Sequence, residues 1–228
     1  MTDPSETRSG EEPLFQLSPS ERRHQEAILL EEARHRVERC LRCPLGKTRN
    51  KSVFGEGNLW GKLLFVGEGP GADEDEQGMP FVGRAGQLLT QILQAAGIRR
   101  EDVYITNVVK CRPPGNRVPT FEEMMACDEY LQTQIALGRP SLLVLLGNTP
   151  TKWILKTTEG ISKLRGRWFS WKGMSVLPMF HPSYLLRYPS STEGSPKHLT
   201  WLDIQEVKRK WDEVRGTDLC SEGEGQLS

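Results

Sequence analysis

The stretch KLLFVGEGPG, residues 62–71, joins an unbroken apolar run to a glycine-rich loop. Three more apolar runs follow it along the chain: VYITNVV at 103–109, SLLVLLG at 141–147 and SVLPMF at 175–180. These runs lack the strict alternation of apolar and polar residues that marks a half-buried strand, which is typical of strands buried on both faces. They predict the inner strands of a short parallel sheet.

Helical patterns separate and flank these runs. We expect helices at about 84–97, 120–138, 148–157 and 200–214, and an earlier one from an N-cap at Ser20 through Arg39. The alternation predicts an α/β protein with three α/β/α layers around a central parallel sheet of about four strands. We expect one domain over residues 19–215, between tails at 1–18 and 216–228 whose polar composition predicts disorder.

The composition narrows the classes of protein that the chain can belong to. Lys plus Arg and Asp plus Glu number 30 each, so net charge neither favours nor excludes nucleic acid, and any basic face must be local. The acidic N-terminus lacks the apolar segment of a signal peptide, and no apolar run approaches the roughly 20 residues of a membrane span. We expect a cytoplasmic protein, or a nuclear one, with no membrane partner. In the cytoplasm and the nucleus, cysteines bind metals or take part in catalysis more often than they form disulfides.

Small and titratable residues follow each predicted strand. The first strand runs into GEGPGADED at 67–75, the second ends at Asn107, the third ends in GNTP and the fourth is followed by HPSYLLR at 181–187. Because ligands bind at the carboxyl ends of strands in open parallel sheets, these residues predict a pocket. The glycine loop is a weak match to a dinucleotide fingerprint, since Gly78 and Pro80 are expected to keep a helix from starting promptly.

Four of the five cysteines suggest a metal site. Cys40 and Cys43 form a C-x2-C pair after the first predicted helix, and Cys111 and Cys127 follow much later, with residues 112–126 between them. Four thiolates suit an iron–sulfur cluster or a structural zinc ion. A zinc ribbon normally has two close pairs, so the wide second pair favours a cluster. The alternative is that Cys111 and Cys127 are ordinary buried cysteines.

Together these motifs resemble the family 4 uracil-DNA glycosylases, the iron–sulfur type. The matching stretches are CLRCPL (40–45), GEGPGADED (67–75), PFVGRAGQLL (80–89), TNVVKCRPPGNR (106–117), Cys127 and HPSYLLR (181–187). The resemblance covers about residues 36–215. It implies a monofunctional DNA repair enzyme that flips uracil out of DNA and hydrolyses its N-glycosidic bond, leaving an abasic site. It also implies a [4Fe–4S] cluster held by Cys40, Cys43, Cys111 and Cys127.

The resemblance assigns the chemistry to three residues of the predicted pocket. It implies that Asn107 reads the uracil edge and that the ring of Phe81 stacks on the flipped base. An amide offers both a donor and an acceptor, which matches the N3–H and O4 of uracil. His181 would donate a hydrogen bond to O2 as negative charge builds on the leaving base.

Other residues receive supporting roles from the same resemblance. Glu68, Gly69 and Pro70 match the loop that contacts uracil, and Glu68 is a further catalytic candidate. Glu74 matches an acid that crowds C5 of the base and so excludes the methyl group of thymine. Asn116 matches an Asn that supports the loop around the site.

Leu186 and Arg187 are the residues expected to touch DNA, by filling the gap left by the extruded base or by gripping phosphate. The expected partner is uracil-containing DNA, bound by a monomer. Two other classes stay open. An iron–sulfur electron carrier would need the cysteines but not Asn107 or His181. A non-catalytic or covalent DNA-binding protein on the same fold is the main alternative. The related branch that bonds covalently to DNA is marked by a GEQPG motif and a basic insertion, and this sequence has neither.

Overall fold

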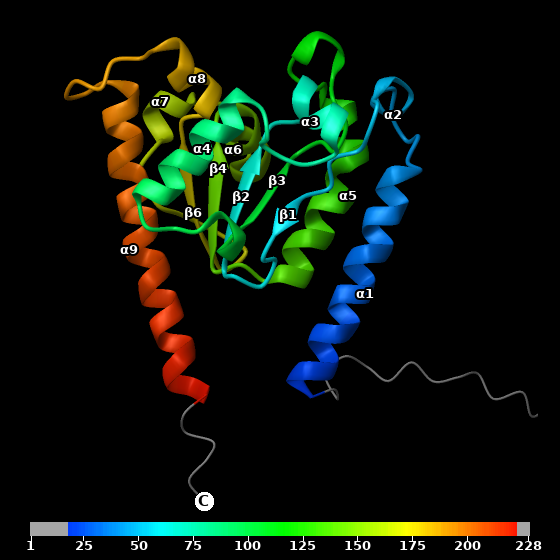
Figure 1. Ribbon diagram of the computed structural model, residues 1–228, viewed down its shortest axis with the longest axis horizontal. Coiled ribbons are helices and arrows are strands. Elements are labelled where there is room, and N and C mark those ends of the chain that lie inside the picture. Colours follow the sequence, from blue (N-terminus) through cyan, green and yellow to red (C-terminus); the bar gives the residue numbers. More distant parts are fainter. Residues whose placement is uncertain (1–17, 223–228) are drawn as a thin grey trace, which may run out of the picture.

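A six-stranded sheet with helices on both faces forms the body of the protein (Figure 1). The computed structural model describes residues 18–222, and the surroundings of side chains within 18–216. The strand order is β1-β3-β2-β4-β6-β5. The strands are β1 (Glu56–Gly57), β2 (Leu63–Gly67), β3 (Tyr104–Asn107), β4 (Leu142–Leu146), β5 (Phe169–Trp171) and β6 (Met174–Met179).

The helices alternate with the strands as the sequence predicts. They are α1 (Pro19–Glu38), α2 (Leu45–Thr48), α3 (Ala72–Gln77), α4 (Arg84–Ala95), α5 (Phe121–Gly138), α6 (Asn148–Leu155), α7 (Ile161–Leu164), α8 (Pro182–Arg187) and α9 (Pro196–Glu222), with single-turn helices η2 (Arg100–Asp102) and η3 (Pro114–Asn116). No helix among the described residues is long and apolar enough to cross a membrane.

The inner strands β3, β2, β4 and β6 run parallel, which confirms the predicted core of the sheet. The two edge strands β1 and β5 pair antiparallel and lie outside that prediction. Each is too short to leave an apolar run in the sequence. In the parallel register Gly67 pairs with Asn107, so β2 and β3 end side by side. The loops after the inner strands therefore meet at one edge of the sheet.

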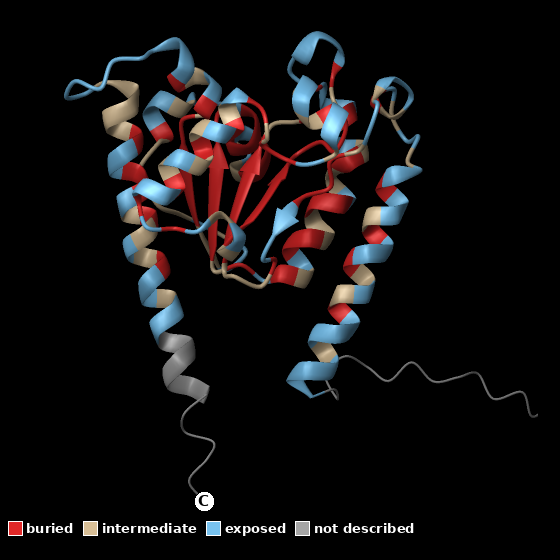
Figure 2. Cartoon of the chain, in the orientation of Figure 1, coloured by how far each residue is buried: buried red, intermediate tan, exposed pale blue. Residues whose placement is uncertain are grey.

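Alternate residues of each inner strand enter two different apolar cores, one on each face of the sheet. Leu64 and Val66 of β2 pack in the core that α1, α5 and α6 cover. Leu63 and Phe65 pack in the opposite core, beneath α4 and α9. Successive side chains of a strand point to opposite faces, so the unbroken apolar run serves both cores. Figure 2 shows the inner strands buried, except for the first two residues of β6, and the helices on both faces (Figure 1) confirm the three-layer arrangement.

The start of the first helix differs from the prediction. The N-cap is Ser18, not Ser20: its hydroxyl oxygen accepts the Glu21 N–H, and the Glu21 carboxylate accepts the Ser18 N–H. This capping box satisfies two backbone donors at once. Pro19 then occupies the first helical position, where its missing N–H costs nothing.

The short helices α2, α3, α7 and α8 were not predicted, and two of them, α3 and α8, follow inner strands. The glycine loop runs directly into α3, so the expectation of no prompt helix was wrong. Gly78 is the C-cap of α3, with a left-handed φ of 82°, and it ends the helix rather than preventing it. Likewise, HPSYLLR forms α8, with Pro182 in its first turn. The predicted tails fall largely outside the described residues, although α9 continues to Glu222.

Candidate active site

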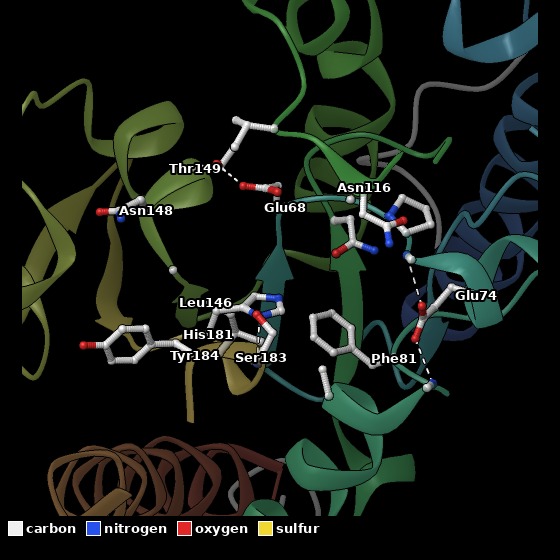
Figure 3. Close-up of a pocket in the computed structure, with 18 of the residues that line it drawn as sticks. Glu68, Glu74, Phe81, Asn116, Leu146, Asn148, Thr149, His181, Ser183 and Tyr184 are labelled. Carbon is white, nitrogen blue, oxygen red and sulfur yellow. Dashed lines mark hydrogen bonds between the residues drawn. The ribbon is translucent and has the colours of Figure 1, made fainter. Parts of the chain in front are cut away.

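A pocket of about 720 Å³ opens at the carboxyl ends of the inner strands (Figure 3). The pocket brings together nine of the ten residues predicted for base, loop and DNA contacts: Glu68, Gly69, Pro70, Glu74, Phe81, Asn107, Asn116, His181 and Arg187. The tenth, Leu186, lies on α8 beside Arg187 but does not line the pocket, and it is 39% exposed. Segments far apart in the sequence therefore build one site.

Asn107 ends β3 and carries an unfilled acceptor into this site. The residue is only 2% exposed, yet its side-chain Oδ1 accepts no hydrogen bond from the described part of the chain. A buried acceptor without a partner costs free energy, so such atoms are rare and call for an explanation. A ligand with an N–H donor would satisfy it.

Gly67 makes room for this arrangement on the neighbouring strand. A Cβ atom at Gly67 would lie 2.3 Å from Asn107 Oδ1 and 2.6 Å from Cζ of Phe81. Neither approach is possible for real atoms, so only glycine lets the amide and the ring come this close to the sheet. Gly69 likewise has no room for a side chain, because a Cβ atom added there would lie 2.7 Å from Cγ2 of Val109.

Phe81 projects its ring into the pocket from a strained backbone. Its φ is +53°, a left-handed value that bulky residues rarely adopt and that persists only where surrounding contacts impose it. Arg100 Nη2 donates to the Pro80 carbonyl at 2.6 Å, and Gly86 lets α4 pack directly on the Phe81 backbone. The ring centroids of Phe81 and His181 are 5.7 Å apart, so the two rings share one side of the pocket.

Glu74 holds the Phe81 segment to the glycine loop. One carboxylate oxygen accepts the N–H groups of Val82 and Gly83, both at 2.9 Å, and the other accepts the Gly71 N–H at 3.0 Å (Figure 3). A carboxylate with several backbone N–H donors is strongly fixed. The structure thus gives Glu74 an organising role that the sequence did not reveal, because two of its partners, Val82 and Gly83, come from a loop beyond the helix. Its predicted steric role stays a prediction.

Glu68 leaves β2 at the opposite side of the pocket. Its carboxylate accepts a hydrogen bond from the hydroxyl of Thr149, which stands in the first turn of α6 (Figure 3). A helix N-terminus favours negative charge, so both the hydroxyl and the helix hold this carboxylate. Thr149 was not among the predicted site residues, although its GNTP segment follows the third predicted strand. Position after a strand was the only signal that pointed to it.

His181 is the N-cap of α8 and lines the pocket in the neutral form. Its Nδ1 accepts the Ser183 N–H at 3.1 Å, so the single proton of a neutral imidazole sits on Nε2. Burial of the ring, and next the positive charge of Arg187, lower the pKa of His181 to about 4. At neutral pH the residue is therefore an uncharged hydrogen-bond donor.

The loop after Cys111 closes the pocket on a third side. Asn116 has a left-handed φ of 56°, and its Oδ1 accepts from Arg112 Nε at 2.8 Å. Arg117 forms two hydrogen bonds with the buried carboxylate of Glu123 at the start of α5, which lowers the pKa of Glu123. The Arg112–Asn116 bond lies within the loop, and Arg117 joins the loop to α5. The supporting role of Asn116 stays a prediction.

The four predicted metal ligands line a second, small cavity. It lies between the end of α1, the segment after β3 and α5, and its wall contains Cys40, Cys43, Cys111 and Cys127. Within residues 18–216, no group of three or more His, Cys, Asp or Glu side chains is arranged to hold a metal ion directly. The thiols are nonetheless gathered from two distant parts of the chain.

Two of these sulfur atoms already have hydrogen-bond donors. Arg49 Nη1 lies 2.8 Å from Cys111 Sγ, and the Lys110 backbone N–H donates to Cys127 Sγ at 3.2 Å. Burial raises the pKa of the Cys127 thiol to about 12 and also raises that of Cys111. Donors of this kind suit thiolates, because negatively charged sulfur needs them more than a neutral thiol does.

Comparison with known proteins gives a consistent result. The model of the uracil DNA glycosylase superfamily matches residues 54–205. A type-4 uracil-DNA glycosylase of Thermotoga maritima is 52% identical over 79% of this chain and 93% of its own length. One of Saccharolobus solfataricus is 44% identical over 67% of this chain and 75% of its own length. A type-5 uracil-DNA glycosylase of Pyrobaculum aerophilum is 31% identical over 66% of this chain and 81% of its own length.

We predict that His181 makes stability depend on pH. Its folded pKa of about 4 lies below the unfolded value of about 6.5. The unfolded chain thus takes up the proton first as the pH falls. The contribution of this group to the unfolding free energy is present above about pH 6.5 and is lost on the way down to about pH 4. Chemical denaturation across this pH window should show that the unfolding free energy falls less steeply with decreasing pH in His181→Asn than in the wild type. An equal pH dependence of the unfolding free energy in both proteins would contradict the prediction.

Proposed function

This chain belongs to the type-4 branch of the uracil DNA glycosylase superfamily, and we propose that its pocket binds and releases uracil from DNA. The activity is that of a uracil-DNA glycosylase, a hydrolase of N-glycosidic bonds that acts in base excision repair. The observation that carries the assignment to this pocket is the buried, unfilled acceptor of Asn107. Uracil, once flipped out of the helix, has the donor that this atom lacks.

Asn107 reads the base through its amide. The Oδ1 atom would accept N3–H of uracil, and the amide NH2 group would donate to O4. Cytosine has no proton at N3 and carries an amino group at position 4, so both contacts would be lost. A site built on such bonds rejects an analogue strongly, because its own buried polar groups stay unpaired. Gly67 supports this role by leaving room for the amide at the end of β3.

His181 stabilises the leaving base. Cleavage builds negative charge on the uracil ring while the sugar becomes an oxocarbenium-like cation. The Nε2–H of a neutral imidazole would donate to O2 of the departing anion, where a preorganised donor is worth most. The low pKa of His181 supports this form, and the Ser183 N–H fixes the tautomer that the donation needs.

Glu68 is the better candidate than Glu74 for contact with water. The carboxylate of Glu74 already accepts three backbone N–H groups. Glu68 accepts one hydroxyl, from Thr149, and so retains acceptor sites that face the pocket. We assign Glu68 to orient the water that completes the hydrolysis and to stabilise the developing positive charge on the sugar.

The DNA itself would be held near α8. Arg187 lines the pocket, and Leu186 next to it is exposed, which suits a phosphate contact and an apolar side chain that fills the space of the extruded base. We expect a monomer to suffice, because one chain supplies every residue proposed for the chemistry. The cytoplasmic location expected from the sequence, or a nuclear one, agrees with a DNA substrate.

Cys40, Cys43, Cys111 and Cys127 would hold a [4Fe–4S] cluster. The four thiols line one cavity, two of them have hydrogen-bond donors, and four thiolates are the usual ligand set. When bound, the cluster would cross-link the segment at the end of α1 to the segment that follows β3 through its metal–thiolate bonds. Its role is structural, and the hydrolysis is carried by the side chains of the pocket.

We predict that Asn107→Ala lowers the single-turnover rate of uracil release by about 10²–10³, because one donor–acceptor group of the transition state is lost. His181→Ala should behave similarly. Binding to uracil-free duplex should change little in either. The assay uses a uracil-containing oligonucleotide, alkali to break abasic sites, and a denaturing gel. A covalent protein–DNA band, or no cleavage by the wild type, would instead favour the DNA-binding alternative.

We predict that Glu74→Ala raises the ratio of thymine release to uracil release. Thymine has the same hydrogen-bonding edge as uracil, so only the space at C5 separates them, and a methyl-sized gap discriminates by only about 1–3 kcal/mol. Uracil release should also slow, since the Phe81 segment loses its fixed carboxylate. Single-turnover cleavage of G·T and G·U duplexes gives the ratio.

Glu74→Gln is the matched control for that test. It keeps the bulk near C5 while it removes the charge and replaces one acceptor oxygen by an NH2 donor, so it should slow uracil release without admitting thymine. An unchanged ratio in Glu74→Ala would move methyl exclusion to another part of the pocket.

We predict that the purified protein is yellow-brown and holds about four iron and four sulfide per chain. Cys111→Ala should lose most of the iron and lower the thermal midpoint, because metal ligation contributes to folding. Cys220→Ala, which alters a cysteine outside the proposed ligands, is the control and should change neither quantity. Stoichiometric zinc without visible absorbance would contradict the cluster.

A further inference from the structure

Lys110 is a charged side chain wholly inside the protein, and none of the proposed chemistry uses it. It is 0% exposed. Its Nζ lies 2.6 Å from Thr106 Oγ1, 2.7 Å from Gln134 Oε1 and 2.8 Å from the backbone oxygen of Asn107. A buried charge is costly unless it is fully hydrogen-bonded, and an ammonium group has three protons for these three acceptors.

The charge on Lys110 follows from the same contacts. A neutral amine at Lys110 would have only two protons for these three acceptors. Only the protonated form can donate to all three oxygens, so these contacts favour the ammonium.

The acceptors around Lys110 are themselves fixed. Gln134 donates through Nε2 to the Phe54 carbonyl at 2.8 Å and to the Tyr104 hydroxyl at 3.1 Å, so its Oε1 must face Lys110. The Thr106 hydroxyl donates to the same Phe54 carbonyl at 2.8 Å. A network in which every member has its partners defines one arrangement and resists movement.

This network ends on the peptide that follows Asn107. Lys110 donates to the carbonyl oxygen of that peptide, which belongs to Asn107. The N–H of the same peptide belongs to Val108 and donates to the Gly67 carbonyl at 2.9 Å. The peptide plane is therefore fixed from both sides at the point where β3 leaves the sheet. The direction of the Asn107 side chain depends on the backbone from which it starts.

We propose that Lys110 is a positioning residue: by holding the Asn107 carbonyl, it aims the amide that reads uracil. This inference rests on the proposed role of Asn107. The backbone of Lys110 also contacts the cysteine cavity, through the bond from its N–H to Cys127 Sγ. One residue thus links the proposed cluster to the base-reading end of the pocket.

The test is a double-mutant cycle between Lys110→Met and Asn107→Ala, read by single-turnover uracil release. Lys110→Met should slow release by about 10- to 100-fold, since small misplacements of a contact have effects of this size. Combined with Asn107→Ala it should add almost nothing, because both changes remove the same interaction. Binding to uracil-free duplex should stay near that of the wild type. Additive losses would indicate general damage and overturn the proposal.

A second variant separates positioning from folding. Lys110→Met with Gln134→Leu replaces the buried polar pair by apolar side chains, a change that is often neutral or stabilising. We expect wild-type iron content and thermal midpoint, with release as slow as in Lys110→Met. Tyr104→Phe is the control: it alters the same network away from Asn107 and should leave the rate unchanged.

The outcomes distinguish the inference from the function beneath it. Wild-type rates in the Lys110 variants would overturn the inference alone, whereas absence of uracil release by the wild type would overturn the proposed function. Failure of both Lys110 variants to fold with iron would assign Lys110 to the fold rather than to Asn107, and would also overturn the proposal.

Discussion

The pairing of Gly67 with Asn107 at the ends of two parallel strands is the contact on which the site depends. Because position 67 has no side chain, the Asn107 amide and the Phe81 ring can both lie against the end of β2. The next residue, Glu68, then leaves the strand toward the other side of the pocket. A single extra methyl group at Gly67 would displace the Asn107 amide and the Phe81 ring together. The rigid sheet thus sets the positions of groups that chemistry requires to be close.

The neighbouring loops hold less regular conformations, and each is maintained by a specific polar group. Phe81 stays at a left-handed φ because Glu74, Arg100 and Gly86 fix the backbone on either side of it. Asn116 also has a left-handed φ, and its side-chain oxygen accepts a hydrogen bond from Arg112 of the same loop. Strain of this kind costs free energy and persists only where the surroundings impose it. In this pocket the Glu74 carboxylate therefore serves the geometry of the loops.

The sequence predicted the inner sheet and the position of the pocket because those features follow from simple patterns, whereas Phe81, Glu74 and Asn116 were assigned from the family resemblance alone. Buried parallel strands require unbroken apolar runs, and polar residues after such strands must converge. Other features depend on contacts that no pattern records. The strands β1 and β5 are too short to show a period, and Gly78 ends α3 where a break was expected. The N–H partners of Glu74 and the burial of Lys110 arise only when distant segments pack together.

The neutral state of His181 has a consequence for the way ionic strength should act on the enzyme. An uncharged donor has no long-range field, so dissolved salt would not screen its proposed contact with the leaving base. The attraction that we propose between Arg187 and the phosphate backbone would, in contrast, weaken steeply as salt rises, because such binding releases counterions. With these proposed roles, salt would govern how often DNA is captured, while the rate of bond breaking, once the base is bound in the pocket, would depend on short-range geometry alone.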